Sequence, residues 1–284
     1  MKVILSRKGF DSENGGIASP IFEDGTMISL PIPSSGDTFS FDDLIYDGKT
    51  YREIIDDLGY KQGVYDCHFD PQLDIGNLIY DLDAQAQAEK TDFWRPSFGQ
   101  VSSSAGYLLN NGIEPGDLFL FFGTFHHVEK VHSHFQYVKH TGDFYKDKDL
   151  HVIWGYMQVG EIAKMYDDLY KFWWHPHSTC NYDKDEWDDS WLNVIFASTD
   201  KLSFDENKPG AGVLPFSKKR VLTLEGESKA MWKKNPIYDL NHIIGNRKNS
   251  AKKAGAIYYA GIWQELMLKE SKSCENWAKK IILG

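Results

Sequence analysis

The amino-acid sequence predicts an α+β protein with a mainly antiparallel or barrel-like central sheet and flanking helices. Residues 118–123 and 151–162 are apolar on both faces, which is typical of strands inside a sheet. The expected strands and helices do not alternate regularly, as a doubly wound parallel sheet would require. No stretch marks a linker, so we expect a single domain over residues 1–284.

The other elements follow from local patterns. A strand is expected within residues 1–10, and a second at residues 26–31, where two prolines end it. Residues 42–58 have helical spacing, and Asn111–Gly112 would close a short helix over residues 99–110. The remaining expectations are strands at residues 192–198 and 220–224 and helices at residues 163–172, 256–270 and 274–282.

Composition limits the class of protein. Its 42% hydrophobic and 25% charged residues are ordinary for a globular chain. Three widely separated cysteines without a C-x-x-C pair argue against a disulfide scaffold and a cysteine zinc site. No apolar run reaches the ~20 residues that span a bilayer, and the first residues lack a signal-peptide pattern. We therefore expect a cytoplasmic protein without a membrane partner.

Charge is unevenly distributed. The net charge is −10, yet residues 201–284 contain 16 Lys and Arg against 8 Asp and Glu. Aromatic rings lie among these cations, and cations with rings are the ingredients of nucleic-acid grooves. The alternative is that this basic segment pairs with the acidic part of the same fold. The candidate nucleic-acid contacts are Lys218, Lys219, Arg220 and Arg247.

A glycine-rich turn with two cations follows the first expected strand. Backbone N–H groups of such a turn, together with cations, form anion sites. A purely structural hairpin is the alternative. The candidate phosphate or sugar contacts are Ser6, Arg7, Lys8, Asp11, Ser12, Gly15 and Gly16.

Two histidine motifs are candidates for acid–base chemistry. His68 and Asp70 share one loop, where they could form a base and its orienting group, although a capping Asp before a proline turn would look the same. His175 and His177 follow two tryptophans, a setting typical of a pocket. The amides of Gln100 and Gln158 could hydrogen-bond a base edge, since an amide offers a donor and an acceptor.

Metal motifs are absent from the sequence. The histidines between residues 126 and 140 lack the spacing of a zinc site, and residues 183–189 are typical of a solvated acidic loop. We assign no metal ligand, and no cofactor is indicated.

Several motifs together resemble one family. The opening SRKGFDS…GG…SPIFEDGTMISLPIP is followed by HFDPQLD, FGQ, GDLFLFFG, HVIWGYMQVGEI, HPH and GAGV in order. This series resembles the third nucleotide-modification-associated domain family over most of the chain. The resemblance implies an association with enzymes that make or handle modified DNA bases in bacteria and phages, and it fixes no reaction. The pair GDLFLFFG and HVIWGYMQVGEI is also locally similar to base-binding barrels of the PUA/EVE type.

Three functions are compatible with these observations. The preferred hypothesis is a protein that binds a nucleotide or DNA base, as an enzyme of base modification. The alternatives are a non-catalytic reader of modified bases with a PUA/EVE-like barrel, and a metal-dependent hydrolase that uses the histidines and Asp70.

Overall fold

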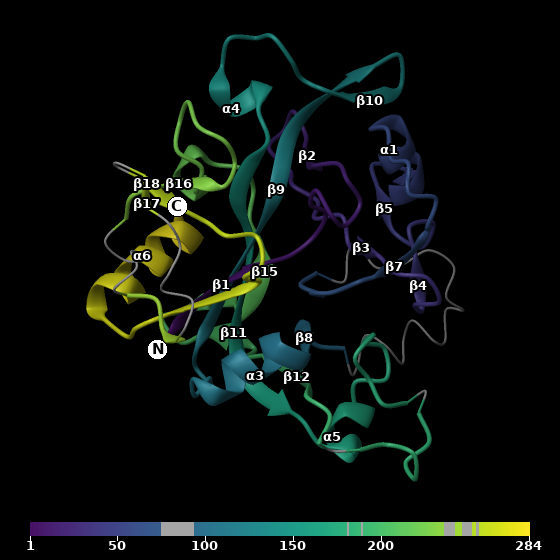
Figure 1. Ribbon diagram of the computed structural model, residues 1–284, viewed down its shortest axis with the longest axis vertical. Coiled ribbons are helices and arrows are strands. Elements are labelled where there is room, and N and C mark those ends of the chain that lie inside the picture. The colour runs from purple at the N-terminus through teal and green to yellow at the C-terminus, as the bar shows by residue number, and fades with distance from the viewer. Residues whose placement is uncertain (75–93, 181, 189, 236–241, 246–251, 254–255) are drawn as a thin grey trace.

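The computed structural model describes residues 1–74, 94–180, 182–188, 190–235, 242–245, 252–253 and 256–284 (Figure 1). A mixed sheet forms its centre, with the order β19–β1–β9–β11–β12–β8. Strands β1 and β9 run parallel, and the other neighbours in this order run antiparallel. The bounds are β1 (Val3–Arg7), β8 (Ser97–Val101), β9 (Leu118–Val131), β11 (Leu150–Ala163), β12 (Asn193–Ser198) and β19 (Glu265–Leu268). Three shorter strands pair with the two long strands of this sheet. They are β2 (Ser19–Ile21) and β10 (His134–Tyr137), which pair with β9, and β15 (Ala211–Val213), which pairs with β11.

Strand β9 explains why the sheet is buried on both faces. Its alternating side chains enter two different cores: Leu118, Leu120 and Phe122 pack on one side, and Phe119 and Phe121 on the other. A strand covered on both faces is continuously apolar. This confirms the strand expected at residues 118–123, which continues to Val131.

Each face of the sheet has its own cover. Helix α6 (Lys272–Leu283) packs on the first core, together with Trp232 and Tyr259 from the last third of the chain. That third contains a small sheet of β16 (Met231–Lys233), β17 (Lys252–Lys253) and β18 (Ala256–Tyr258). Helix α3 (Ser102–Asn110) packs on the opposite core through Ala105 and Leu108. Figure 1 shows α6 and α3 apart, α6 beside β1 and α3 beside β8.

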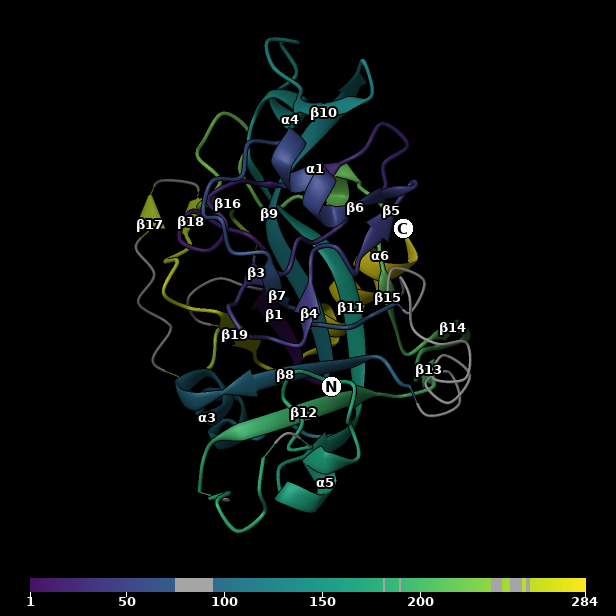
Figure 2. The ribbon, with the colours of Figure 1, turned by 90° about the vertical axis from the view of Figure 1, so that its right-hand side faces the viewer.

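The N-terminal residues after β1 build a separate core. Its sheet consists of β3 (Ile32–Pro33), β4 (Phe39–Ser40) and β7 (Asp66–His68), which Figure 2 shows in front of the main sheet. A hairpin of β5 (Ile45–Tyr46) and β6 (Lys49–Thr50) leads into α1 (Tyr51–Asp57). Thr50 and Glu53 form a reciprocal capping box there, which fixes the start of the helix. This core holds β7, and therefore His68, in place opposite β8.

The remaining described elements lie at the periphery. They are α4 (Phe144–Asp147), α5 (Tyr166–Tyr170), β13 (Lys201–Leu202), β14 (Asp205–Pro209) and a 3₁₀ turn at Lys218–Arg220. None of the described helices is both long and apolar enough to cross a membrane.

The α+β class is confirmed, and over the described residues the sheet is open rather than a closed barrel. Four local expectations are wrong. Residues 42–58 are helical only from Tyr51, because Asp47 and Gly48 take left-handed φ values of 49° and 74° in a hairpin turn. Residues 256–270 contain β18 and β19 instead of a helix, because Glu265–Leu268 completes the sheet beside β1. Residues 26–31 and 220–224 form only isolated bridges.

Candidate functional site

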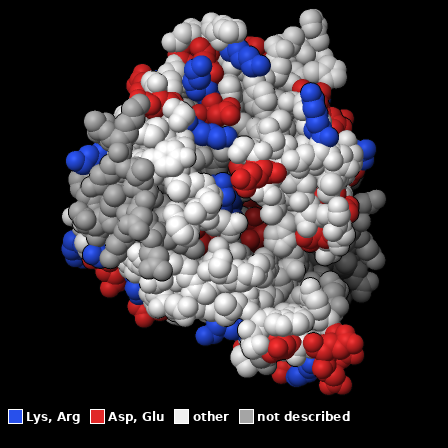
Figure 3. All heavy atoms as spheres, viewed as in Figure 1, with Lys and Arg blue, Asp and Glu red and all other residues white. Residues whose placement is uncertain are grey.

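A cavity of about 910 Å³ lies between the small N-terminal sheet and the main sheet. Figure 3 shows a recess near the middle of this face, with acidic and basic side chains on its walls. The cavity is bordered by the end of β1, the β3–β4 turn, β7, β8, the start of α3 and residues 176–178. Its lining includes many of the residues singled out from the sequence: Arg7, Lys8, Asp11, His68, Asp70, Gln100 and His177.

Asp70 is a buried carboxylate at the back of this cavity. Its Oδ1 accepts hydrogen bonds from Nε2 of His175 at 3.1 Å and from the backbone N–H of Gly99 at 2.8 Å. Burial raises the pKa of Asp70, but the hydrogen bond from His175 and the electrostatic effects of His175, His177 and Lys8 together outweigh burial and lower the pKa to about 2. Asp70 is therefore ionised at neutral pH, and the side chain of His175 lies wholly buried behind it.

The tautomer of His175 follows from its partners. Its Nδ1 accepts a hydrogen bond from the backbone N–H of His177 at 3.1 Å, so its proton sits on Nε2, facing Asp70. His175 therefore orients Asp70 from outside the cavity lining, and it does not face a ligand.

The tautomer of His177 is fixed in the same way. The amide of Asn193 donates from Nδ2 to the carbonyl of His177 at 2.9 Å, so its Oδ1 faces the ring and accepts from Nδ1 at 3.0 Å. Burial lowers the pKa of His177 to about 3, so the ring is neutral. Its Nε2 is consequently an unprotonated acceptor that faces His68.

His68 meets this acceptor from β7. Its Nδ1 lies 2.7 Å from Oδ2 of Asp37, and its Nε2 lies 2.9 Å from Nε2 of His177. A carboxylate can only accept, so the Nδ1 of His68 carries a proton. Burial raises the pKa of Asp37, but the hydrogen bond and the charge interaction with His68, together with hydrogen bonds from Thr38 and Ser34, outweigh burial and lower it. The structure thus points two imidazole Nε2 atoms at each other on the cavity wall.

Gly99 makes room for this arrangement. A Cβ at this position would lie 2.0 Å from Cδ2 of His177 and 2.8 Å from Cε1 of His175. Such distances are far below van der Waals contact, so a side chain here would displace the His177 ring. The β8 strand therefore needs glycine at this point to let both histidines approach its backbone.

The two cations of the cavity are already paired. Arg7 lies 2.8 Å from Asp11, and Lys8 lies 3.3 Å from the fully buried Glu265. Gln100 donates to the same glutamate at 2.7 Å. An anion entering the cavity would have to compete with these carboxylates, so the cations alone do not form an open phosphate site.

The start of α3 offers a different anion-binding feature. Ser102, Ser103 and Ser104 line the cavity, and no side chain caps this nine-residue helix. The first N–H groups of a helix have no partner within the helix and lie at the positive end of its dipole. The N–H of Ser102 donates to the carbonyl of Leu192 at 2.8 Å, so an anion would meet the N–H groups of Ser103 and Ser104 instead. A single phosphate or a carbonyl group could accept from them.

Several lining residues could not be selected from the sequence. Asp37, Asn193 and Gln264 complete the polar wall, but each comes from a different loop or strand end without a motif. Only the pairing of β7 with β3, of β12 with β8 and of β19 with β1 brings them together. Proximity of this kind leaves no signal in a single sequence.

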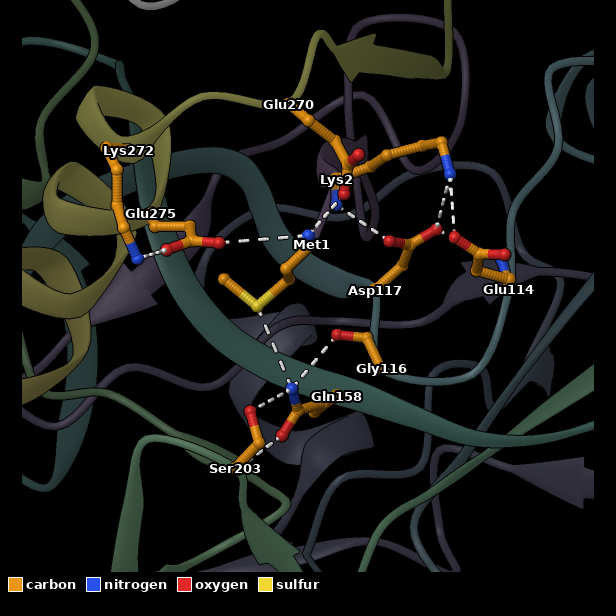
Figure 4. Close-up of polar contacts among 10 residues, drawn as sticks. All are labelled: Met1, Lys2, Glu114, Gly116, Asp117, Gln158, Ser203, Glu270, Lys272 and Glu275. Atoms are coloured by element: carbon orange, nitrogen blue, oxygen red, sulfur yellow. Dashed lines mark hydrogen bonds and ion pairs between the residues drawn. The ribbon is translucent and has the colours of Figure 1, made fainter.

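Other predicted ligand contacts lie outside the lining. Ser6 is buried and donates to Glu265, Ser12 is exposed, and Gly15 and Gly16 form the turn with φ values of 85° and 73°. Gln158 lies elsewhere, where its amide bonds the carbonyl of Gly116 at 3.0 Å and Oγ of Ser203 at 2.8 Å (Figure 4). Its amide holds the sheet end against neighbouring loops.

The predicted nucleic-acid contacts that the structure describes lie outside the cavity lining. Arg220 is buried and donates to the carbonyls of Ile281 at 2.9 Å and Pro215 at 2.7 Å. Lys218 lies 4.4 Å above the ring of Tyr145, and Lys219 is exposed. Arg247 lies outside the described residues.

Comparison with known proteins gives one match. The family model described as Nucleotide modification associated domain 3 (Nmad3) matches residues 2–269 of the 284 residues. No curated protein and no solved structure shows a significant match. The matched range includes every described residue that lines the cavity. The chain therefore belongs to the Nucleotide modification associated domain 3 family.

Proposed function

We propose that the cavity binds the base and sugar of a nucleotide, or a modified base, and that the protein acts on it as an enzyme. The observation that supports this most directly is the convergence of an ionised carboxylate and two facing imidazoles on the wall of one polar cavity. Perturbed ionisable groups in a cleft are typical of catalytic sites. At about 910 Å³ the cavity is also large enough for a nucleotide.

The roles follow from the hydrogen bonds. Asp70 and the His68–His177 pair would exchange protons with the ligand, while His175 and Asp37 orient them. Gln264 offers an amide to a base edge at the other side of the cavity. Because Arg7 and Lys8 are paired, the ligand best matched is a nucleoside or a nucleoside monophosphate, with its phosphate at the start of α3.

The lining favours an enzyme over a reader of bases. Readers usually stack a base on aromatic walls. Among the described lining residues, Tyr182 is the one Tyr, Trp or Phe, whereas acid–base groups are abundant.

Replacing Ser103 with aspartate tests the phosphate position. The carboxylate would occupy the second position of α3, where negative charge suits the helix but repels a phosphate. Calorimetry should show at least tenfold weaker binding of a nucleoside monophosphate, about 1.4 kcal/mol, and unchanged binding of the nucleoside.

Ser273→Asp is the matched control, because it makes the same change at the second position of α6, outside the cavity lining. It should leave both affinities unchanged. Equal monophosphate binding by Ser103→Asp and the wild type would contradict the proposed phosphate position. If a screen of nucleosides, monophosphates and modified bases found no ligand, the proposed function itself would be wrong.

A further inference from the structure

The facing histidines have an electrostatic problem that the hydrogen bonds do not solve. The Nδ1 of His68 is committed to Asp37, and the Nδ1 of His177 to Asn193, so Nε2 is the nitrogen that each ring turns toward the other. The two Nε2 atoms are 2.9 Å apart. Two lone pairs at this distance repel unless a positive charge lies between them or beside both.

A third donor lies next to the pair. Donor atoms of His68, Asp70 and His177 all lie within 4.8 Å of one another. Both described hydrogen bonds to Asp70 use Oδ1, and among the described residues none is made to Oδ2. Oδ2 of Asp70 is therefore available to coordinate a cation.

From this geometry we infer that His68, His177 and Asp70 bind one divalent transition-metal ion through two Nε2 atoms and a carboxylate oxygen. Imidazole and carboxylate together suit such ions. Histidine ligands usually donate their other N–H to a carboxylate or an amide, which fixes the ring, and Asp37 and Asn193 provide these contacts here.

The separation of the nitrogens is informative about the ion. With metal–nitrogen distances of about 2.0–2.1 Å, nitrogens 2.9 Å apart subtend an angle of about 90° at the ion. This is the angle between neighbouring ligands in an octahedron, so the geometry favours Mn²⁺, Fe²⁺, Co²⁺ or Ni²⁺ over tetrahedral Zn²⁺.

The alternative positive charge is a proton shared by the rings. A shared proton needs no third donor, and it would leave the carboxylate of Asp70 outside the pair. The three donors also all line the cavity, which leaves further coordination positions open to water or to a ligand. With the ion bound, the three side chains act as its ligands instead of exchanging protons themselves. The ion lowers the pKa of its bound water, so this water would supply a nucleophile to the cavity.

Cobalt binding tests the site without any nucleotide. Chelator-treated protein would be titrated with Co²⁺ by calorimetry and by visible absorption. We expect one Co²⁺ per chain with a Kd below about 0.1 mM. His68→Gln and His177→Gln should each weaken binding at least tenfold, and Asp37→Asn, which changes a positioning residue, about 10–100-fold.

His134→Gln is the matched control, because His134 also pairs with a carboxylate, Asp57, but is 73% exposed and lies outside the cavity lining. It should bind Co²⁺ like the wild type. Circular dichroism and melting curves of each variant would separate lost binding from lost folding, and His68→Gln is the safest variant because His68 is partly exposed.

No Co²⁺ binding by the wild type, or equal binding by folded His68→Gln and His177→Gln, would overturn the assignment. The metal is titrated alone, and nucleoside binding is measured with chelator present. Failure of the metal site and failure of the nucleotide site are therefore distinguishable.

Discussion

Replacing Gly99 with alanine tests the arrangement of the site through a single methyl group. Its Cβ would lie 2.0 Å from Cδ2 of His177, and ordinary contact begins at 3.4 Å, so the ring must move by about 1.4 Å. The hydrogen bond of 3.0 Å to Asn193 does not survive such a shift, and the 2.9 Å approach of the ring to His68 is lost with it.

The expected loss of stability has two contributions. One lost hydrogen bond costs about 1 kcal/mol, and overpacking costs about 1–3 kcal/mol, so the free energy of unfolding should fall by about 2–4 kcal/mol. For a chain of this length about 2 °C accompanies each kcal/mol, so the melting temperature should fall by about 4–8 °C. Co²⁺ binding should be lost in the same protein.

Differential scanning calorimetry and the Co²⁺ titration measure both effects. Gly261→Ala is the control, since the nearest atom to its Cβ is Nη1 of Arg7 at 3.8 Å, an ordinary contact. It should melt within about 1 °C of the wild type. A Gly99→Ala protein with wild-type melting and wild-type Co²⁺ affinity would refute the packing and the metal assignment together.

Two further outcomes are expected. Burial lowers the pKa of His151 to about 3 and of His127 to about 4, so the unfolded chain binds protons below about pH 6.5 that the folded chain rejects. The free energy of unfolding should therefore decrease as the pH is lowered, by about 1.4 kcal/mol per pH unit for each ring between pH 6 and 5. Denaturant titrations at pH 7, 6 and 5 measure this decrease, and equal free energies at the three pH values would contradict it. Arg220→Ala should lower the free energy of unfolding by about 1–3 kcal/mol, because it leaves the buried carbonyl of Ile281 without this donor and removes the bond to the partly buried carbonyl of Pro215. Replacing the exposed Lys219 with alanine should change it by less than about 0.5 kcal/mol. Equal melting of the two variants would show that the Arg220 contacts contribute nothing.

The sequence predicted the strands of the sheet better than its edges. Strands buried on both faces, such as β9 and β11, are continuously apolar, and that pattern is local. Strand β19 was mistaken for part of a helix because its four apolar or buried residues carry no period of their own. Its conformation is decided by pairing with β1, more than 250 residues away.

The site was predictable only in part for a similar reason. His68, Asp70 and His177 stand in short motifs with chemical character, so each could be named, but their mutual distances depend on the fold. Gln158 was also selected from the sequence, but it lies away from the cavity and bonds a loop carbonyl. In a sequence, an amide on a strand looks the same whether it binds a ligand or a loop carbonyl. Asp37 and Asn193 gave no local signal.

The pairing of β1 with β9 and β19 also has a consequence for how the chain folds. β1 leaves the ribosome before its neighbours, which are made more than 110 and 250 residues later. Contacts of such sequence separation slow folding, and β1 keeps an unpaired edge until β19 is synthesised. The cavity is bordered by Arg7 and Lys8 on one side and by Gln264 on the other, so the binding site is completed only after residue 264 has been made. A chain stopped before residue 264 would contain every histidine of the site and still lack a closed cavity.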